Sequence, residues 1–572
     1  TTVTIDEGSA SELAAVSATT LSVTAAGAIT DTGAVNVSTD ASFSATGGAS
    51  ITLNTLDVGG SIALTTTGAG AATIVNAGPT DLAASSIGAD LTVTSTTGNL
   101  TDSGIIAVGD DATFTTSQAG ADIFLGTLQI TDEISVNTNG GGGNATITDS
   151  GGTEFRASNV GGTLTLNASG PVTDVGQVIV GGTTTINNAG DPITLDFGTH
   201  QFGTLVLSGT NVEVREGVAM DLGACTITGN GTFVTSNDPI TDSGNISIGG
   251  LATFNAGTDD ISLGDGTNAN FGSLNLTGAT VQVNEQGATT INGGTVSTAL
   301  TLTSGGAIDD NGGITVNGLA TFTAAGGTQS IILNNTPNFG SLDLDGTTVT
   351  IDEGSASELA AVSATTLNVT AAGAITDTGA VNVGGDATFT ATGGASITLD
   401  TLDVTGSIAL STAVAGDATI TNAGVTDLDV SGIAGNLSVT SPGHITQSGA
   451  LTVGGTSDFT IITNADQDIL LDSFPNDLAG AVSIAEVAPG SIRNFALWNI
   501  SAAATLPGVG IVSGDITIIF SGTGITLPAL TVGGNLSVSA GGTIDQSGIL
   551  DVTGTSTFTV TAAGSNIDLA SE

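Results

Sequence analysis

A verbatim internal duplication constrains the fold of this chain more than any other sequence feature. Residues 1–21 (TTVTIDEGSASELAAVSATTL) recur unchanged at residues 347–367, and close similarity continues from residue 22 to residue 64 in the first copy. A chain of 572 residues exceeds the ~250–300 residues at which one hydrophobic core stops growing. It therefore forms several domains or one elongated repeat, and the duplication favours the repeat.

A shorter period lies inside the duplicated block. The phrase I-T-D-x-G is followed by V-G-G-x-A-T-F and then by I-x-L, and its last glycine recurs at a nearly even spacing. The first five intervals fill the offset between the two copies, so residues 1–346 form a block of five units of roughly 69 residues each, whose start recurs at 347–410. The anchoring glycines are Gly33, Gly104, Gly176, Gly244, Gly312, Gly379, Gly449 and Gly548.

Within each unit, apolar residues alternate with polar ones, as at Leu342 and Leu344. This period of two predicts strands with one apolar face, and Gly-Gly and Asp-Gly dipeptides separate them. Only Ser9–Ala18 and its copy Ser355–Ala364 have a helical composition. Both are short and uncapped, so we expect a loop or one distorted turn there.

Two all-β architectures compete for such a pattern. Immunoglobulin-like sandwiches need about 100 residues and a large buried aromatic per domain, which a unit of about 69 residues with one Phe does not provide. Stacked coils share their small interior residues between neighbours at about 4.8 Å per coil. The sequence therefore predicts a right-handed parallel β-helix (β-solenoid), continuous over residues 1–572, with about three coils of roughly 23 residues per unit.

The last interval between anchoring glycines, from Gly449 to Gly548, is longer than the others; we call it the long interval. We expect residues 450–548 to form a longer unit with an extra coil or a proline-bearing loop. The interval also holds the single Trp498 together with Arg493, a pair of residue types that often anchors protein contacts. A docking patch is the sharper alternative for this segment.

The charge balance excludes several kinds of partner. There are 53 acidic and three basic residues, giving a formal net charge of −50, so the surface repels nucleic acid and anionic membranes. The chain has no apolar run of the roughly 18 residues or more that a bilayer-spanning helix needs, and the single Cys225 cannot form an internal disulfide. We expect neither nucleic-acid binding nor membrane insertion, and association that responds to salt or divalent cations.

The recurring carboxylates offer a candidate metal site. Equivalent aspartates three coils apart would be separated by about 14 Å at ~4.8 Å per coil, too far to share one Ca²⁺. We favour turn-forming aspartates over calcium ligands, and we expect the aligned Glu7, Glu216, Glu285 and Glu353 to lie in solvated turns. The aspartates are Asp31, Asp102, Asp174, Asp242 and Asp377.

Catalytic constellations are scarce in the sequence. His200 and His444 lie in different units, and Cys225 has no base nearby in sequence. We predict no catalytic, cofactor-binding or metal-binding residues and no enzymatic activity. The phenylalanines at one repeat position, called the Phe column below, are expected in the core together with Ile186; they are Phe43, Phe114, Phe254, Phe322, Phe389, Phe459 and Phe558.

The phrases G-x-L-x-L-x-A-x-G-x-I-T-D-x-G and V-G-G-x-A-T-F-x-A resemble the tandem repeats of filamentous-haemagglutinin-like bacterial surface adhesins. The resemblance covers nearly the whole chain and implies a secreted or cell-surface protein used for adhesion or as a fibre. We therefore expect a structural protein that associates with itself into a filament and contacts cell-surface glycans. The alternatives are a carbohydrate- or ice-binding surface, since the strands are rich in Thr, and a polysaccharide-acting enzyme.

Overall fold

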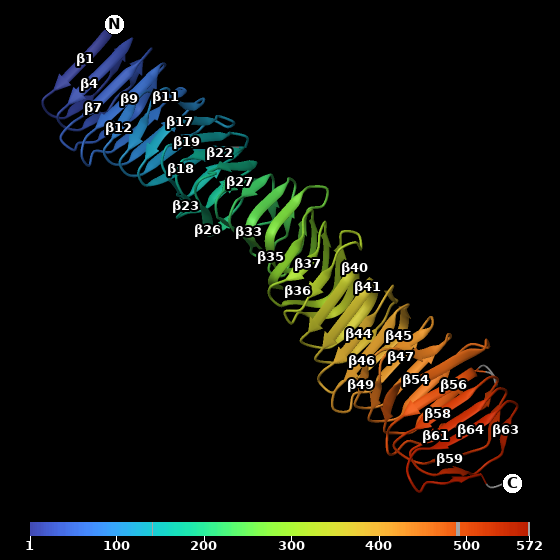
Figure 1. Ribbon diagram of the computed structural model, residues 1–572. Helices are drawn as coiled ribbons and strands as arrows, with labels where there is room; N and C mark the ends of the chain where they lie inside the picture. Colours follow the sequence, from blue (N-terminus) through green and yellow to red (C-terminus); the bar gives the residue numbers. More distant parts are fainter. Residues whose placement is uncertain (140, 488–491, 570–572) are drawn as a thin grey trace. The chain divides into compact units, whose positions relative to one another are not determined.

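A computed structural model describes residues 1–139, 141–487 and 492–569 of the chain. The described residues contain strands and no helix, and the strand pairs are parallel. The chain divides into two compact units, Thr1–Gln286 and Gly287–Glu572. In each unit the strands stack turn upon turn (Figure 1). The described residues form about 28 turns in all. The predicted all-β parallel solenoid is confirmed.

Each turn of the first unit has two sides. One side is a long strand, such as β4 (Thr20–Ala25), which pairs with β7 (Ala41–Ala45) in the next turn. The other side is a pair of short strands, β5 (Ile29–Asp31) and β6 (Val35–Val37), which both pair with the bent strand β8 (Ile51–Val58). A side of the solenoid is therefore either straight, made of one long strand, or bent, made of two short strands or of one bent strand such as β8.

The first repeat continues with β9 (Ser61–Thr66), β10 (Ala72–Asn76) and the short pair β11 (Thr80–Leu82) and β12 (Ser85–Ile87). The next repeat begins at β13 (Leu91–Ser95), which pairs with β10. One repeat thus contains four long sides and three bent sides, or three and a half turns, instead of the three turns expected from the sequence.

The half-turn places equivalent residues of consecutive repeats on opposite sides of the solenoid. Phe43 stacks between Val23 and Leu64 in one ladder. Its equivalent in the next repeat, Phe114, lies in the other ladder, next to Val93. Most ladder partners in adjacent turns, such as Thr2↔Thr20, are closer in sequence than the roughly 23 residues expected for one coil. The turns are therefore shorter than the sequence suggested.

The core follows the predicted alternation. In β16 (Ala112–Thr116), residues 112, 114 and 116 are buried and the two between them face outward. The Phe column and Ile186 are buried as predicted, except that Phe558 near the end of the second unit is half-buried. Burial of a side chain of this size contributes roughly 1.5–3 kcal/mol to the stability of the fold. The rings of Phe233 and Phe254 also stack, with their centroids 5.5 Å apart.

The anchoring glycines are required by the close approach of successive turns. A Cβ atom added at Gly33 would lie 1.3 Å from the carbonyl oxygen of Ala14, and one at Gly379 would lie 1.7 Å from that of Ala360. Real Cβ atoms do not approach backbone atoms so closely. Only glycine allows the turn to lie against the preceding one at these positions.

The stretch Ser9–Ala18 forms strands, contrary to the expected loop or distorted turn. Its residues make β2 (Ser11–Leu13) and β3 (Val16–Ala18), which pair with β5 and β6. The second copy likewise belongs to β41 (Ser357–Ala371). Parallel pairing with the neighbouring turn outweighs the weak helical preference of Ala, Ser and Glu.

The long interval contains an additional turn. It is made of β58 (Ile516–Phe520), β59 (Ile525–Leu527) and β60 (Leu530–Val532). Strand β58 pairs with β56 (Ile492–Asn499) on one side and with β61 (Leu536–Ala540) on the other. Residues 500–510, which include Pro507, form no strand.

Candidate functional sites and surfaces

The recurring aspartates hold the bent strand of the next turn. Asp31 Oδ1 accepts the backbone N–H of Asn54 at 2.9 Å, and Oδ2 accepts the N–H and the hydroxyl of Thr55, both at 2.7 Å. Asp102 and Asp377 make the same contacts with their own next turns. Because these carboxylate oxygens already accept backbone and hydroxyl donors, the preferred role as turn-forming aspartates fits the geometry.

One copy of this anchor contains a histidine. His200 is fully buried, and its Nε2 lies 3.1 Å from Asp174 Oδ2 while Nδ1 accepts the N–H of Val178 at 2.9 Å. Because Nδ1 is an acceptor, the ring proton lies on Nε2 and is donated to Asp174. The ring also stacks on Phe202 at 5.4 Å. His200 thus occupies a structural position.

Cys225 is likewise unsuited to act as a nucleophile. Its side chain is buried, with Sγ 3.6 Å from the carbonyl oxygen of Leu205. Burial raises the pKa of the thiol to about 12, so the nucleophilic thiolate is not populated near neutral pH. His444 belongs to the second unit, where its Nδ1 accepts the backbone N–H of Asp468 at 2.9 Å.

Three of the four aligned glutamates are buried, so the expectation of a solvated turn is wrong for them. Glu216, Glu285 and Glu353 are each 1% exposed. Each accepts the backbone N–H of a phenylalanine 14 residues earlier, at 2.8–3.3 Å. Desolvation raises the pKa of Glu216 to about 8 and that of Glu353 to about 7.

The burial of these glutamates has a signal in the sequence that the turn interpretation missed. Glu353 follows Val349 and Ile351 at steps of two, so the alternation of the strand directs all three side chains to the same, inner face. Glu7 occupies the same position in an identical sequence and is exposed. In the second copy the preceding turn covers this strand: residues 331–333 pair with residues 349–351, and Phe339 donates its N–H to Glu353.

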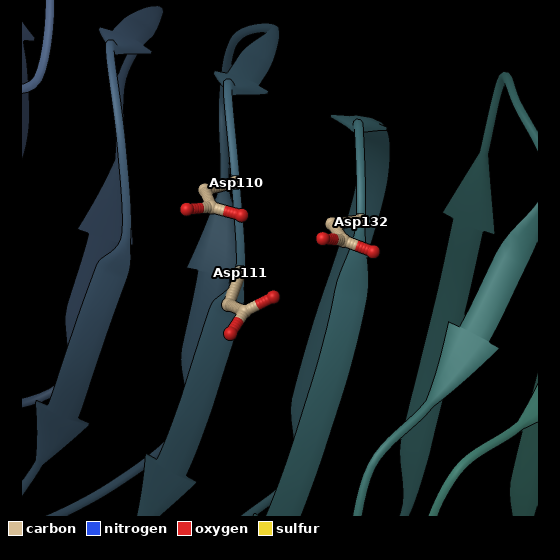
Figure 2. Close-up of side chains that lie close together, drawn as sticks. All are labelled: Asp110, Asp111 and Asp132. Carbon is tan, nitrogen blue, oxygen red and sulfur yellow. The ribbon is translucent and has the colours of Figure 1, made fainter.

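An acidic cluster lies on the surface of the first unit. Carboxylate oxygens of Asp110, Asp111 and Asp132 lie within 4.8 Å of one another, from two neighbouring turns (Figure 2). Desolvation and the repulsion of the neighbouring carboxylates raise the pKa of Asp110. Arg156 Nη1 contacts Asp111 at 2.5 Å and its Nε contacts Glu133 at 2.7 Å. The arginine therefore already balances part of the charge, and sequence reasoning did not identify this cluster.

Arg493 is committed to an internal ion pair. It contacts the buried carboxylate of Asp468 through both Nε, at 2.9 Å, and Nη2. Although burial alone would raise the pKa of Asp468, the bonds and charge of Arg493 hold it below the usual value. Trp498 Nε1 donates to Ser521 Oγ at 2.9 Å. These contacts secure the long interval, and a docking role for Trp498 stays a prediction.

The comparisons with known proteins give one result. The family described as "Repeats of unknown function (DUF5649)" matches eight segments of the chain. They are residues 1–65, 69–137, 142–208, 209–277, 278–342, 346–411, 415–485 and 513–572. The chain belongs to this repeat family. No curated protein and no solved structure shows significant similarity to it.

In this chain, a DUF5649 repeat is a unit of seven solenoid sides. The residues between the last two matched segments, 486–512, fall within the long interval and include the Arg493 contacts. The matches support the coarser part of the resemblance, a repeat protein with a β-helical fold. Among the described residues there is no apolar helix of membrane-spanning length.

Hydroxyl groups form a row on the outer faces of four neighbouring DUF5649 strands, β8, β10, β13 and β16. Successive ladder partners place Thr52, Thr73, Thr92 and Thr113 in one row, with Thr94 and Thr115 beside the last two. The rows have the ~4.8 Å spacing of parallel strands. These Thr residues therefore form ordered rows locally.

Proposed function

We propose that this protein is a structural scaffold of the cell surface or extracellular space. It assembles with itself into filaments that have an adhesive or extracellular-matrix role. The observation that carries the proposal is the stacking of interchangeable turns. The duplicated segment has the same register in both copies, with Thr2 opposite Thr20 and Thr348 opposite Thr366. Such a structure extends by adding turns without a new core.

The inventory of polar groups agrees with a structural role. Hydrogen bonds within the fold are made by the aspartates of the repeat phrase, by His200 and by Arg493. The secreted or surface location and the adhesive use come from the resemblance to filamentous-haemagglutinin-like adhesins. Cell-surface glycans are the proposed partners outside the filament.

The acidity sets the conditions of assembly. A formal net charge of −50 makes copies repel one another, and salt shortens the range of this repulsion to about 8–10 Å near physiological ionic strength. The experiment is sedimentation velocity and electron microscopy of the purified protein over a range of NaCl and CaCl₂ concentrations. Assembly that grows with ionic strength supports the scaffold, and a monomer under every condition refutes it.

The hydroxyl rows favour one second candidate, a surface that binds carbohydrate or ice. Thr73, Thr92 and Thr113 face outward at regular spacing. A glycan array and a thermal-hysteresis measurement test this candidate. Replacing the three threonines by valine should abolish such binding, whereas the same change at the buried Thr80 and Thr184 leaves the outer rows intact and serves as the control.

A further inference from the structure

A buried polar side chain connects two successive turns at seven places in the described structure. Each accepts the backbone N–H of a residue in the preceding turn, and we call these side chains the bend bridges. Three are amides and four are acids. The pairs, with the N–H donor first, are Val58 with Asn76, Ile130 with Asp149, Phe202 with Glu216, Phe271 with Glu285, Phe339 with Glu353, Val404 with Asn422 and Leu478 with Asn499.

The amide bridges form hydrogen bonds in both directions. Asn76 Oδ1 accepts the N–H of Val58 at 2.9 Å, while its Nδ2 donates to the carbonyl oxygen of Val58 at 3.3 Å and to that of Pro79 at 2.9 Å. Asn422 forms the same pair of bonds with Val404, at 2.9 and 3.2 Å. Both ends of the buried amide are therefore satisfied, and no charge enters the core.

Two of the glutamate bridges satisfy only one end. Glu353 Oε1 accepts the N–H of Phe339 at 2.9 Å, and Glu216 Oε2 accepts that of Phe202 at 3.3 Å. Within the described residues the second carboxyl oxygen of each is buried without a hydrogen-bond partner. A carboxylate only accepts hydrogen bonds, so ionisation leaves an uncompensated charge there. A protonated carboxyl group is neutral and carries one donor and one acceptor, as the amide does.

Asp149 shows what a buried acid needs in order to carry its charge at this position. Its carboxylate accepts the N–H groups of Ile130, Ser150 and Gly151 and the hydroxyl of Thr153. Burial raises the pKa of Asp149, and these four donors lower it. The two glutamates with an unpaired oxygen have one backbone donor each, so their ionised forms lack this compensation.

The neighbours of Glu216 favour its neutral form. Its ladder partner in the preceding turn is His200 of β26 (Ile193–His200), whose ring proton on Nε2 points to Asp174 and which is therefore uncharged. Asp221 in β29 (Met220–Leu222) adds a like charge that opposes ionisation. The ladder partner in the following turn is the uncharged Thr235.

The neighbours of Glu353 also provide no counterion. The preceding turn contributes the carboxylate of Asp310, which accepts backbone N–H groups of the bend. Asp352, next in sequence, lies on the outer face, and the ladder partner in the next turn is Ala371. The polar side chain beside the carboxyl group is the buried hydroxyl of Ser357. None of these groups carries a positive charge.

We propose that Glu216 and Glu353 are proton-dependent bridges, which hold two successive turns together when protonated and loosen the bend when ionised. The pKa values of about 8 for Glu216 and about 7 for Glu353 place the change near neutral pH. Because the folded-state pKa values are raised, the stabilisation is complete in acid and is lost as the pH rises through these values. The amide bridges do not titrate. This inference concerns the fold of the repeats and is independent of the filament proposal.

The test is hydrogen-exchange mass spectrometry of the full chain at pH 5 and 8, with each rate corrected for the intrinsic pH dependence of amide exchange. It compares the bends bound by these glutamates, residues 193–202 and 331–339, with bends bound by amides, residues 51–58 and 397–404. We expect protection at the glutamate bends to fall about tenfold or more at pH 8. It should fall severalfold less at the amide bends, and equal losses at all four would overturn the proposal.

Two substitutions connect the pH response with the proton on Glu353. Glu353→Gln supplies an amide, so it should remove the pH dependence at residues 331–339 and retain protection there at pH 8. Asp352→Asn changes the charge by the same amount on the outer face and should leave the pH dependence as it is. Circular dichroism at both pH values verifies that each variant is folded. A pH dependence in E353Q equal to that of the unmodified chain would contradict the proposal.

The reverse substitution keeps the test decisive if E353Q does not fold. Asn422→Asp places a carboxyl oxygen where Nδ2 donates to the carbonyl oxygen of Val404, so only a protonated oxygen fits there. We expect N422D to acquire a pH dependence at residues 397–404 that the unmodified chain lacks, with protection near the unmodified value at pH 5. If N422D responds to pH no more than the unmodified chain, a proton at this position does not control the bend and the proposal fails.

Discussion

The carboxylate of Glu353 accepts the backbone N–H of Phe339 at 2.9 Å, across 14 residues and inside the core. Its other oxygen is buried without a hydrogen-bond partner. A carboxyl group in such a place is more stable protonated, because desolvation penalises the charge. The pKa of about 7 for Glu353 and about 8 for Glu216 expresses this preference.

We predict that these glutamates make the fold less stable as the pH rises from 5 to 8. Their folded-state pKa values lie above the ordinary 4.5, so the folded chain binds more protons than the unfolded one. Their contribution is complete below pH 4.5 and is lost as the pH rises through 7 and 8, at up to about 1.4 kcal/mol per pH unit and group.

The measurement is thermal unfolding of the E216Q/E353Q variant and of the unmodified protein at pH 5 and 8. The general repulsion of a chain with charge −50 also weakens in acid, so the informative quantity is the difference between the two pH slopes. The double variant should have the smaller slope. E7Q, at the exposed equivalent position, is the matched control, and equal slopes in all three proteins would refute the prediction.

Removal of an aspartate anchor should loosen the turn that it holds. Asp31→Ala removes three hydrogen bonds to Asn54 and Thr55, and charge-assisted bonds of this kind contribute about 1.5–3 kcal/mol each at most, less when water replaces them. We expect a loss of about 2–4 kcal/mol locally, seen as faster amide exchange in β8. Asp57→Ala in the same strand removes an exposed carboxylate and should change little.

The anchoring glycines should tolerate no side chain. Gly379→Ala forces a Cβ against the Ala360 carbonyl, and overpacking of this kind typically costs about 1–3 kcal/mol or more. We expect a clear fall in the unfolding temperature. Gly424→Ala, where no atom lies within 4 Å of the added Cβ, is the control; similar unfolding temperatures for both variants would contradict the close-approach argument.

The ion pair of the long interval should be worth more than an exposed one. Arg493→Ala leaves the buried carboxylate of Asp468 without its arginine partner, and we expect this to cost more stability than the loss of an exposed ion pair. Arg215 pairs with the half-buried Glu213 on an outer strand face, and Arg215→Ala should cost about 0–1 kcal/mol. Urea denaturation of both variants measures the difference, and equal losses would show that Asp468 is adequately solvated or bonded without Arg493.

Much of the fold is encoded in local patterns that can be read directly. The alternation in segments such as Ala112–Thr116 predicts both the strand and its buried face, and the Phe column marks the core. The recurrence of glycine predicts the repeat length. These inferences succeed because side-chain direction in a strand depends only on parity.

The number of turns per repeat could not be derived in the same way. The strands Ile29–Asp31 and Val35–Val37 look like two separate sides in sequence, but β8 and β10 show that both lie on one bent side. That fact is a property of pairing between turns. The structural role of Asp31 and the acidic cluster of Asp110 and Asp132 likewise depend on contacts across one turn, which spacing alone does not specify.

The most direct test of the scaffold is cryo-electron microscopy of the protein under assembling salt conditions. The account predicts filaments built from stacked parallel strands at a spacing of about 4.8 Å. Monomers at every salt and calcium concentration would contradict it.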